Sequence, residues 1–159
     1  MAITRSRITT VVAAVCLSAA SAIAVPAFAQ SPGGDFVTVK STHDYSATVS
    51  DLQQSVKSNG LMVMGKVNQK AILSMTGLHL AGAESFLVGN PRVGKKLFSM
   101  NPAVAAVVPA RISVWVSDGT TYVGYFKPSA QLSALSSGLS KPGQMLDMKF
   151  QKIVKEATH

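Results

Sequence analysis

Three histidines are the residues with which this chain could perform acid–base or nucleophilic chemistry. His43 stands beside Asp44 and close to Ser41, the three residue types of a serine hydrolase. Neighbouring residues at the start of a helix point in different directions, however, whereas a catalytic triad is assembled from distant segments. His79 would need a carboxylate from elsewhere, and His159 is the last residue. We therefore assign no catalytic residue and keep a small hydrolase-like enzyme using His43 or His79 as an alternative.

Two methionines could hold a soft metal ion. Met62 and Met64 alternate on a predicted strand, which places their thioethers on one face, and thioethers suit Cu(I). The simpler interpretation is that methionine fills gaps in the core, as Met75 and Met100 are predicted to do on helical stripes. The single cysteine, Cys16, lies near the N-terminus. No metal ligand and no cofactor are assigned, and a periplasmic copper-binding protein using Met62 and Met64 is a further alternative.

A small or anionic ligand has better candidates. Asn90-Pro91 is typical of the start of a helix, whose free N–H groups can bind an anion, although a structural cap is the commoner use. Arg92 and Lys95 add positive charge to the same helix, and aromatic rings elsewhere could wall a pocket. The candidate ligand-binding residues are Asn90, Arg92, Lys95, Trp115 and Tyr122.

The two aromatic residues of that set also indicate a partner. Trp115 faces Tyr122 across a predicted hairpin, on the face opposite Ile112 and Val114. If helices cover the aliphatic face, something else must cover the rings. A second subunit, a ligand and a helix of the same chain are all open at this point.

The charge pattern restricts the partners further. The chain carries a formal net charge of +8, and beyond residue 29 it has eleven lysines against two arginines. Such a surplus attracts anionic envelope polymers or lipid headgroups, and it is equally consistent with a solvated lysine surface. Nucleic acid is not expected, because lysine lacks the bidentate geometry used to read bases and because the chain carries an export signal.

Residues 1–29 are predicted to be a secretory signal peptide. Arg5 and Arg7 precede an apolar stretch over residues 8–25, and Ala27-Phe28-Ala29 is a small-x-small cleavage site. Cleavage after Ala29 leaves a flexible leader over 30–35 and no transmembrane segment. We therefore expect a periplasmic or secreted protein.

The remaining residues must supply the elements that position these candidates. Alternation of apolar and polar residues predicts strands over residues 36–40, 61–67, 84–88, 111–117 and 120–126. One face of the second strand is expected to carry Leu61, Val63, Gly65 and Val67. A helix capped by Ser41 or Thr42 is expected to start near Asp44 and to end at Asn59-Gly60, and shorter helices follow Asn68, Asn90 and Asn101. Two more helices are expected over residues 130–139 and 144–158.

The strongest local signal is Asp118-Gly119, the two-residue turn of a type I′ hairpin between the last two strands. Strands and helices alternate before this hairpin, and helices follow it. The order predicts a single α+β domain over residues 36–159, with a largely antiparallel sheet of about five strands and helices packed mainly on one face.

Motifs from Gly89 onward resemble those of a known family. They are Gly89-Asn90-Pro91 with Gly94 and Leu97, Asn101-Pro102, Pro109-Ala110-Arg111, Val114-Trp115-Val116, Asp118-Gly119 and Tyr125. This set is similar to the domain of unknown function 302 family and covers most of residues 36–135. The resemblance implies a compact α+β fold, one or two copies per chain and frequent dimers, with no established activity.

Two departures from that family pattern concern its chemistry. Members often carry Asp-His where this chain has Asn68-Gln69, and Val107-Val108 replaces an acidic, leucine-rich segment. We therefore expect an exported, non-catalytic module of unknown function, a homodimer that binds a small or anionic ligand or a partner protein.

Overall fold

The computed structural model describes residues 35–159, so the predicted signal peptide and residues 30–34 of the leader lie outside the described part. The strands are β1 (Phe36–Lys40), β2 (Met62–Val67), β3 (Ala83–Gly89), β4 (Ala110–Ser117) and β5 (Thr120–Phe126). The helices are α1 (Tyr45–Ser58), α2 (Gln69–Ser74), α3 (Pro91–Met100), α4 (Pro128–Leu135) and α5 (Ser140–Thr158), with short 3-10 turns over Pro102–Ala106 and Ser137–Leu139. Within residues 35–159 no helix combines the length and the apolar character needed to cross a membrane.

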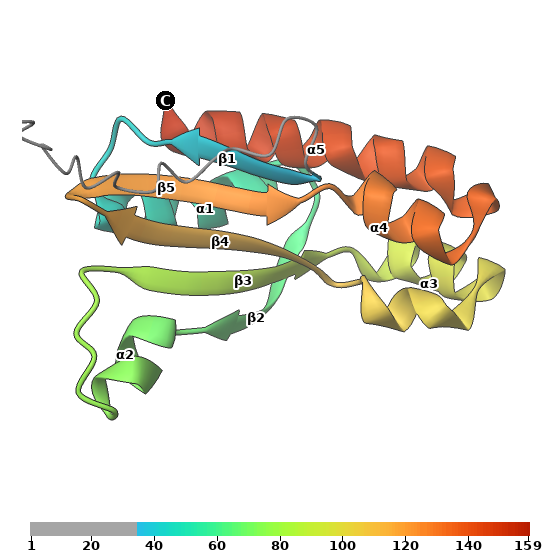
Figure 1. Cartoon of the computed structure of the whole chain (residues 1–159). Coiled ribbons are helices and arrows are strands. Elements are labelled where there is room, and N and C mark those ends of the chain that lie inside the picture. Colours follow the sequence, from blue (N-terminus) through green and yellow to red (C-terminus); the bar gives the residue numbers. More distant parts are fainter. Residues whose placement is uncertain (1–34) are drawn as a thin grey trace, which may run out of the picture. The chain divides into compact units, whose positions relative to one another are not determined.

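The five strands form one antiparallel sheet in the order β1-β5-β4-β3-β2. Helices α1 and α5 cover one face of it, whereas α3 and α4 lie beyond one end (Figure 1). The short helix α2 lies beside β3 near the β2 edge. The predicted α+β class, strand number and antiparallel sheet are confirmed.

The hairpin of β4 and β5 has the predicted register. Asp118 and Gly119 both have positive φ, 48° and 71°, as a type I′ turn requires. Trp115 consequently pairs with Tyr122. Their side chains lie on the face of the sheet that α1 and α5 leave open, because the alternate positions Ile112 and Val114 are buried in the core.

The cap of α1 differs from the prediction. Asp44, not Ser41 or Thr42, is the N-cap, and its Oδ1 accepts the N–H of Ala47 at 2.9 Å. Ser41 is buried, and its hydroxyl pairs with Thr48 Oγ1 at 2.7 Å. The chain bends at Thr42 and His43 after β1, and Asp44 has an extended backbone, so the helix begins only after this acidic residue, which also suits the helix dipole.

The alternation predicted for β2 is wrong beyond Val63. Val63 pairs with Val88, but Gly65 pairs with Leu87, so Met64 is an extra residue on this strand. This β-bulge moves Gly65 and Val67 to the face opposite Val63. A bulge depends on the partner strand, which periodicity within β2 does not reveal.

The C-terminal helix begins at Ser140, four residues before the predicted start, and the helix predicted over 130–139 ends at Leu135. Pro142 is tolerated in the first turn of α5 because its missing N–H has no partner there. A Cβ on Gly143 would lie 2.4 Å from Ser129 Cα. Glycine at this position therefore permits the close contact of α4 and α5 rather than ending a helix.

Two apolar clusters hold the described residues together. The larger lies between the sheet and helices α1 and α5, around Leu52, Phe86, Ile112, Phe150 and Ile153. The smaller lies beyond the end of the sheet and consists of Leu97, Val104, Leu132, Leu139 and Leu146. Each fully buried side chain of this kind contributes about 1.5–3 kcal/mol.

Candidate functional site

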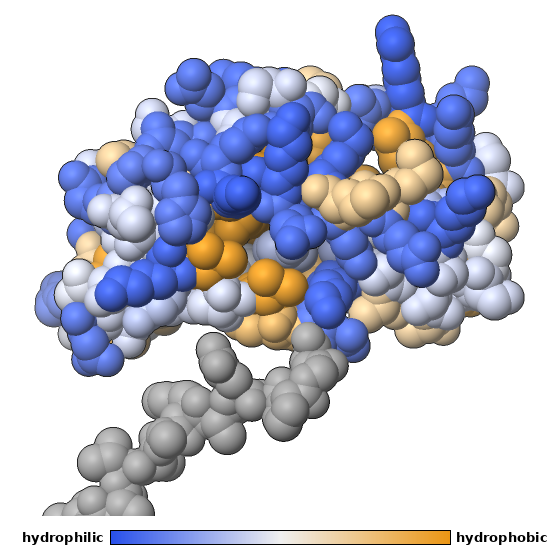
Figure 2. Space-filling view, turned by 90° about the horizontal axis from the view of Figure 1, so that it is seen from above, coloured by the Kyte–Doolittle hydropathy of each residue, from blue (hydrophilic) through white to orange (hydrophobic). Residues whose placement is uncertain are grey.

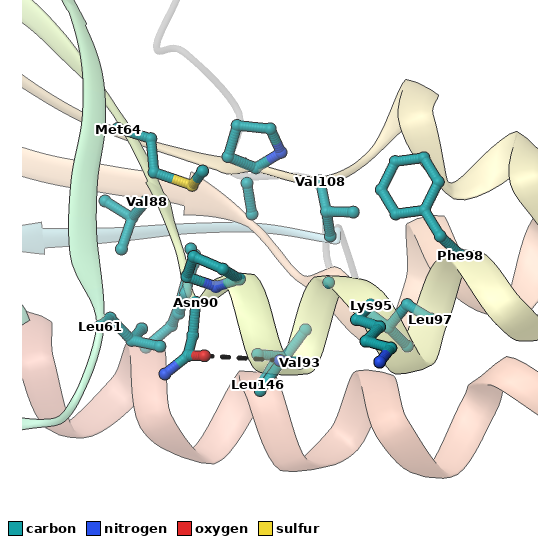
Figure 3. Close-up of a pocket in the computed structure, with 16 residues that line it drawn as sticks. Leu61, Met64, Val88, Asn90, Val93, Lys95, Leu97, Phe98, Val108 and Leu146 are labelled. Atoms are coloured by element: carbon teal, nitrogen blue, oxygen red, sulfur yellow. Dashed lines mark hydrogen bonds between the residues drawn. The ribbon is translucent and has the colours of Figure 1, made fainter.

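A cavity of about 330 Å³ lies at the junction of the two apolar clusters (Figure 3). Its walls come from β2, the end of β3, α3, the start of β4 and α5. The apolar lining residues are Leu61, Met64, Val88, Val93, Leu97, Phe98, Val108, Ala110, Leu146 and Phe150. Pro91 and Pro109 and the backbone of Gly89 and Gly94 complete the wall together with Asn90 and Lys95. The volume and the apolar walls are those of a small-molecule site.

Glycines at two positions give the cavity its shape. A Cβ on Gly89 would come within 2.9 Å of Met64 Sδ and 3.4 Å of Pro109 Cβ, so a larger residue there would displace the Met64 side chain from the cavity wall. A Cβ on Gly94 would meet no atom within 4 Å. The space beside α3 is therefore open rather than filled by neighbouring side chains.

Asn90 positions α3 at the mouth of this cavity. Its Oδ1 accepts the N–H groups of Arg92 at 2.8 Å and Val93 at 3.4 Å, and its Nδ2 donates to the carbonyl of Gly60 at 2.8 Å. The side chain thus caps the helix N-terminus, which was the commoner of the two uses considered for it (the contact with Val93 is drawn in Figure 3). Asn90 therefore lines the cavity, but its polar side-chain atoms are bonded to the backbone of α3 and of Gly60.

Lys95 is the one charged residue among those that line the cavity. It is exposed, and so are Arg92 and Lys96 on the same helix. Helix α3 contains no acidic residue to neutralise these three cations. The mouth of an apolar cavity therefore carries the positive charge of Lys95, which favours a ligand with an apolar body and an anionic end.

The five predicted binding residues do not form one site. Asn90 and Lys95 line the cavity, whereas Arg92 lies on α3 outside the lining. Trp115 and Tyr122 lie on the open face of the sheet. Sequence reasoning missed Phe98 at the cavity because it falls outside the apolar stripe of α3.

The family follows from a comparison with known proteins. Residues 37–157 match the family described as "Domain of unknown function DUF302". This chain belongs to that family. It is similar in structure to "uncharacterized conserved protein DUF302 from Bacillus stearothermophilus", with a TM-score of 0.72 and 20% identity over 77% of this chain and 97% of that one. At this identity the likeness shows the fold alone, and none of the curated proteins matches the chain.

The DUF302 domain carries an aromatic cluster on the open face of its sheet. Ring centroids lie 5.7 Å apart for Trp115 and Tyr122, 6.3 Å for Phe36 and Trp115, and 4.8 Å for Phe36 and Phe126. A Cβ on Gly124 would lie within 2.9 Å of Trp115 and Phe36, so glycine makes room for both rings. We call Phe36, Trp115, Tyr122 and Phe126 the aromatic face.

The histidines of the DUF302 domain lie apart from the cavity. His43 Nδ1 is 3.0 Å from Asp51 Oδ2, in a half-buried pair. Its neighbour Asp44 caps α1 and Ser41 is bonded to Thr48, so the residues adjacent in sequence form no triad. His79 is exposed in the loop after α2 and makes no ion pair within the described chain.

The methionines do not fill the core as expected. Met62, Met64, Met75 and Met100 are all exposed. His79 lies in the loop joining α2 to β3, beyond the end of β2 opposite Met62, which does not favour a shared copper site. Among residues 35–159 there is also no cluster of three His, Cys, Asp or Glu side chains that could hold a metal ion.

Two tyrosines are held neutral within the domain. Burial, together with the carboxylate of Glu84, raises the pKa of Tyr45 to about 12. Burial also raises the pKa of Tyr125, whose ring packs edge-on against Phe150 at 5.4 Å beside the cavity. Both phenols therefore stay neutral to a higher pH than an exposed tyrosine does.

Proposed function

We propose that the domain is an exported, non-catalytic binding module whose cavity takes an anionic amphiphile. The observation that carries this proposal is an apolar cavity whose lining contains one charged residue, the cation Lys95. The predicted signal peptide over residues 1–29 supports export to the periplasm or beyond.

Both ends of such a ligand have a partner in the cavity. Each methylene group that leaves water for the apolar wall contributes about 0.8 kcal/mol. The anionic end would meet the ammonium group of Lys95, with Arg92 and Lys96 on the same helix and no acidic residue on α3. A carboxylate and a phosphate monoester both supply the anionic oxygens that a lysine at the mouth of the cavity binds.

Calorimetry with three probes that share an unbranched ten-carbon chain tests the proposal: decanoate, decanol and decyltrimethylammonium. The protein is the product expected after cleavage at Ala29. Decanoate should bind tightest, because it alone satisfies the apolar wall and the cation. Lys95→Gln should weaken decanoate binding several-fold and leave decanol binding unchanged, because an exposed charge pair contributes up to about 1 kcal/mol.

Lys96→Gln is the matched control, because Lys96 is an exposed neighbour on α3 that does not line the cavity. It should change decanoate binding little. Gly94→Leu should abolish binding of decanoate and decanol alike by filling the open space beside α3. Equal affinity for all three probes, or binding unaffected by Gly94→Leu, would exclude the cavity as the site.

We also propose that the domain is a homodimer joined through the aromatic face. Phe36 and Phe126 are exposed, and neither α1 nor α5 covers this side of the sheet. Exposed apolar patches of several side chains are typical of interaction sites, and aromatic residues are enriched in them.

A hydrolase-like enzyme using His43 is the second candidate, favoured by the 3.0 Å contact between His43 and Asp51. A carboxylate in this position can orient an imidazole that acts as a general base. Hydrolysis of p-nitrophenyl esters tests it, with His43→Ala as the variant and His79→Ala as the control. An activity lost with His43→Ala alone would favour this candidate over the binding module.

A further inference from the structure

Helix α5 has a second face that the fold does not use. Its inner stripe, Leu146, Phe150, Ile153 and Ala157, is buried against the sheet and the neighbouring helices. On the opposite side Lys141, Met145, Met148 and Lys152 follow one another at spacings of four, three and four residues, which places them on one line along the helix. We call these four residues the outer stripe.

The two methionines of the outer stripe are exposed side by side on the helix. Met145 is 57% and Met148 64% exposed, one turn apart at the middle of the stripe. Methionine is a flexible apolar side chain that normally fills gaps or forms adaptable contact surfaces. These two methionines lie between Lys141, which makes no ion pair among residues 35–159, and Lys152, which lies 3.7 Å from Glu156.

The charges around the outer stripe are predominantly positive. Helix α5 carries four lysines and two acidic residues. Asp147 is turned toward α4, where it accepts hydrogen bonds from the backbone and side chain of Ser129. Glu156 accepts hydrogen bonds from Ser55 and Asn59 on the side of α1 and lies 3.7 Å from Lys152.

Helix α1, which packs against α5, adds charges of both signs. Lys57 is exposed near its end, whereas Asp51 is paired with His43. Lys149 donates to the carbonyl of Asn59 at 3.1 Å, so its charge is kept near the same surface. Lys141 and Lys155 make no ion pair among residues 35–159. The helix thus presents more cations than its neighbours neutralise.

Figure 2 views the molecule from the side on which α5 and β1 lie in Figure 1. Hydrophilic side chains cover most of this surface, and apolar side chains are exposed between them.

We infer that the outer stripe of α5 binds the surface of an anionic lipid bilayer. Lysines attract the headgroups of anionic lipids, and the methionine side chains enter the boundary between headgroups and acyl chains. A soluble polyanion would satisfy the lysines equally well, but it offers no apolar phase to Met145 and Met148. This surface lies on the side of α5 opposite Leu146 and Phe150, which line the cavity, so the inference stands independently of the cavity's ligand.

Vesicle co-sedimentation of the mature chain tests the inference. Vesicles of phosphatidylcholine mixed with phosphatidylglycerol should retain the protein at low salt, and vesicles of phosphatidylcholine alone should not. Lys141→Gln with Lys152→Gln should lower the partition coefficient roughly fivefold for each lysine. Met145→Ser with Met148→Ser should also lower it, at unchanged charge.

Lys40→Gln with Lys96→Gln is the matched control, because it removes the same charge from exposed positions on β1 and α3. Circular dichroism of each variant verifies that it is folded. The inference is overturned if the control loses as much binding as the α5 lysine variant, which would indicate attraction to net charge alone. It is also overturned if the methionine variant binds normally, or if the unaltered protein does not sediment with anionic vesicles.

Discussion

Tyr45 gives a prediction that depends on a single side chain. Its hydroxyl is buried and has no partner of good hydrogen-bond geometry within the described chain. Burial and the carboxylate of Glu84 raise its pKa from 10.0 to about 12, against a smaller opposing effect of the Ala83 backbone. Because the pKa of Tyr45 is higher in the folded than in the unfolded chain, its contribution to the free energy of unfolding is fully present below pH 10. This contribution is lost as the pH rises toward about 12, because the tyrosine of the unfolded chain ionises first. Tyr45→Phe should therefore leave stability at neutral pH within about 1 kcal/mol or raise it. Tyr45→Phe should also reduce the loss of stability above pH 10.

Urea unfolding at neutral and alkaline pH measures both effects. An equally steep loss of stability at alkaline pH in the variant would contradict the assignment of this loss to Tyr45.

Residue types predicted the caps of this domain far better than they predicted its cavity. Asn68 and Asn90 cap their helices as expected, because an asparagine before a helix acts through bonds to residues two or three positions away. The cavity instead joins Leu61, Phe98 and Leu146, which are distant in the sequence. Lys95 could be singled out as a candidate ligand residue, but the apolar walls that give it a role depend on how α3 packs against α5.

At the scale of elements, the contact between α4 and α5 sets a strict limit on residue 143. A Cβ there would lie 2.4 Å from Ser129 Cα and 3.0 Å from Ser129 N, which are backbone atoms of α4. Gly143→Ala should therefore destabilise the domain by about 1–3 kcal/mol, although alanine favours a helix by about 1 kcal/mol. Gly94→Ala is the matched control in α3, because its Cβ meets nothing within 4 Å, and it should stabilise by up to about 1 kcal/mol. Urea unfolding of both variants compares the two effects. If the two glycines gave the same change in free energy of unfolding, the close packing of α4 on α5 would be wrong.

Elements whose signals are local were predicted well, and those set by their neighbours were not. The hairpin of β4 and β5 follows from Asp118-Gly119, whose backbone favours positive φ. The bulge at Met64 and the early start of α5 at Ser140 follow from β3 and α4 respectively. By sequence alone Pro142-Gly143 indicates a break between two helices. The close packing of Gly143 against Ser129 explains why glycine stands inside α5.

At the scale of the whole molecule, the open sheet face predicts assembly. The mature chain should be a dimer by native mass spectrometry, because the aromatic face of each copy would otherwise remain in water. Phe126→Ser should shift the population to monomers, since Phe126 is 54% exposed and its loss removes interface area without opening the core. Met100→Ser is the control, because Met100 is exposed to the same extent, 54%, but lies on α3 away from the aromatic face. A dimer that resists Phe126→Ser as fully as Met100→Ser would place the interface elsewhere. A monomeric unaltered chain would contradict the dimer and leave the aromatic face, with Phe36 and Phe126 exposed, to a partner of a different kind.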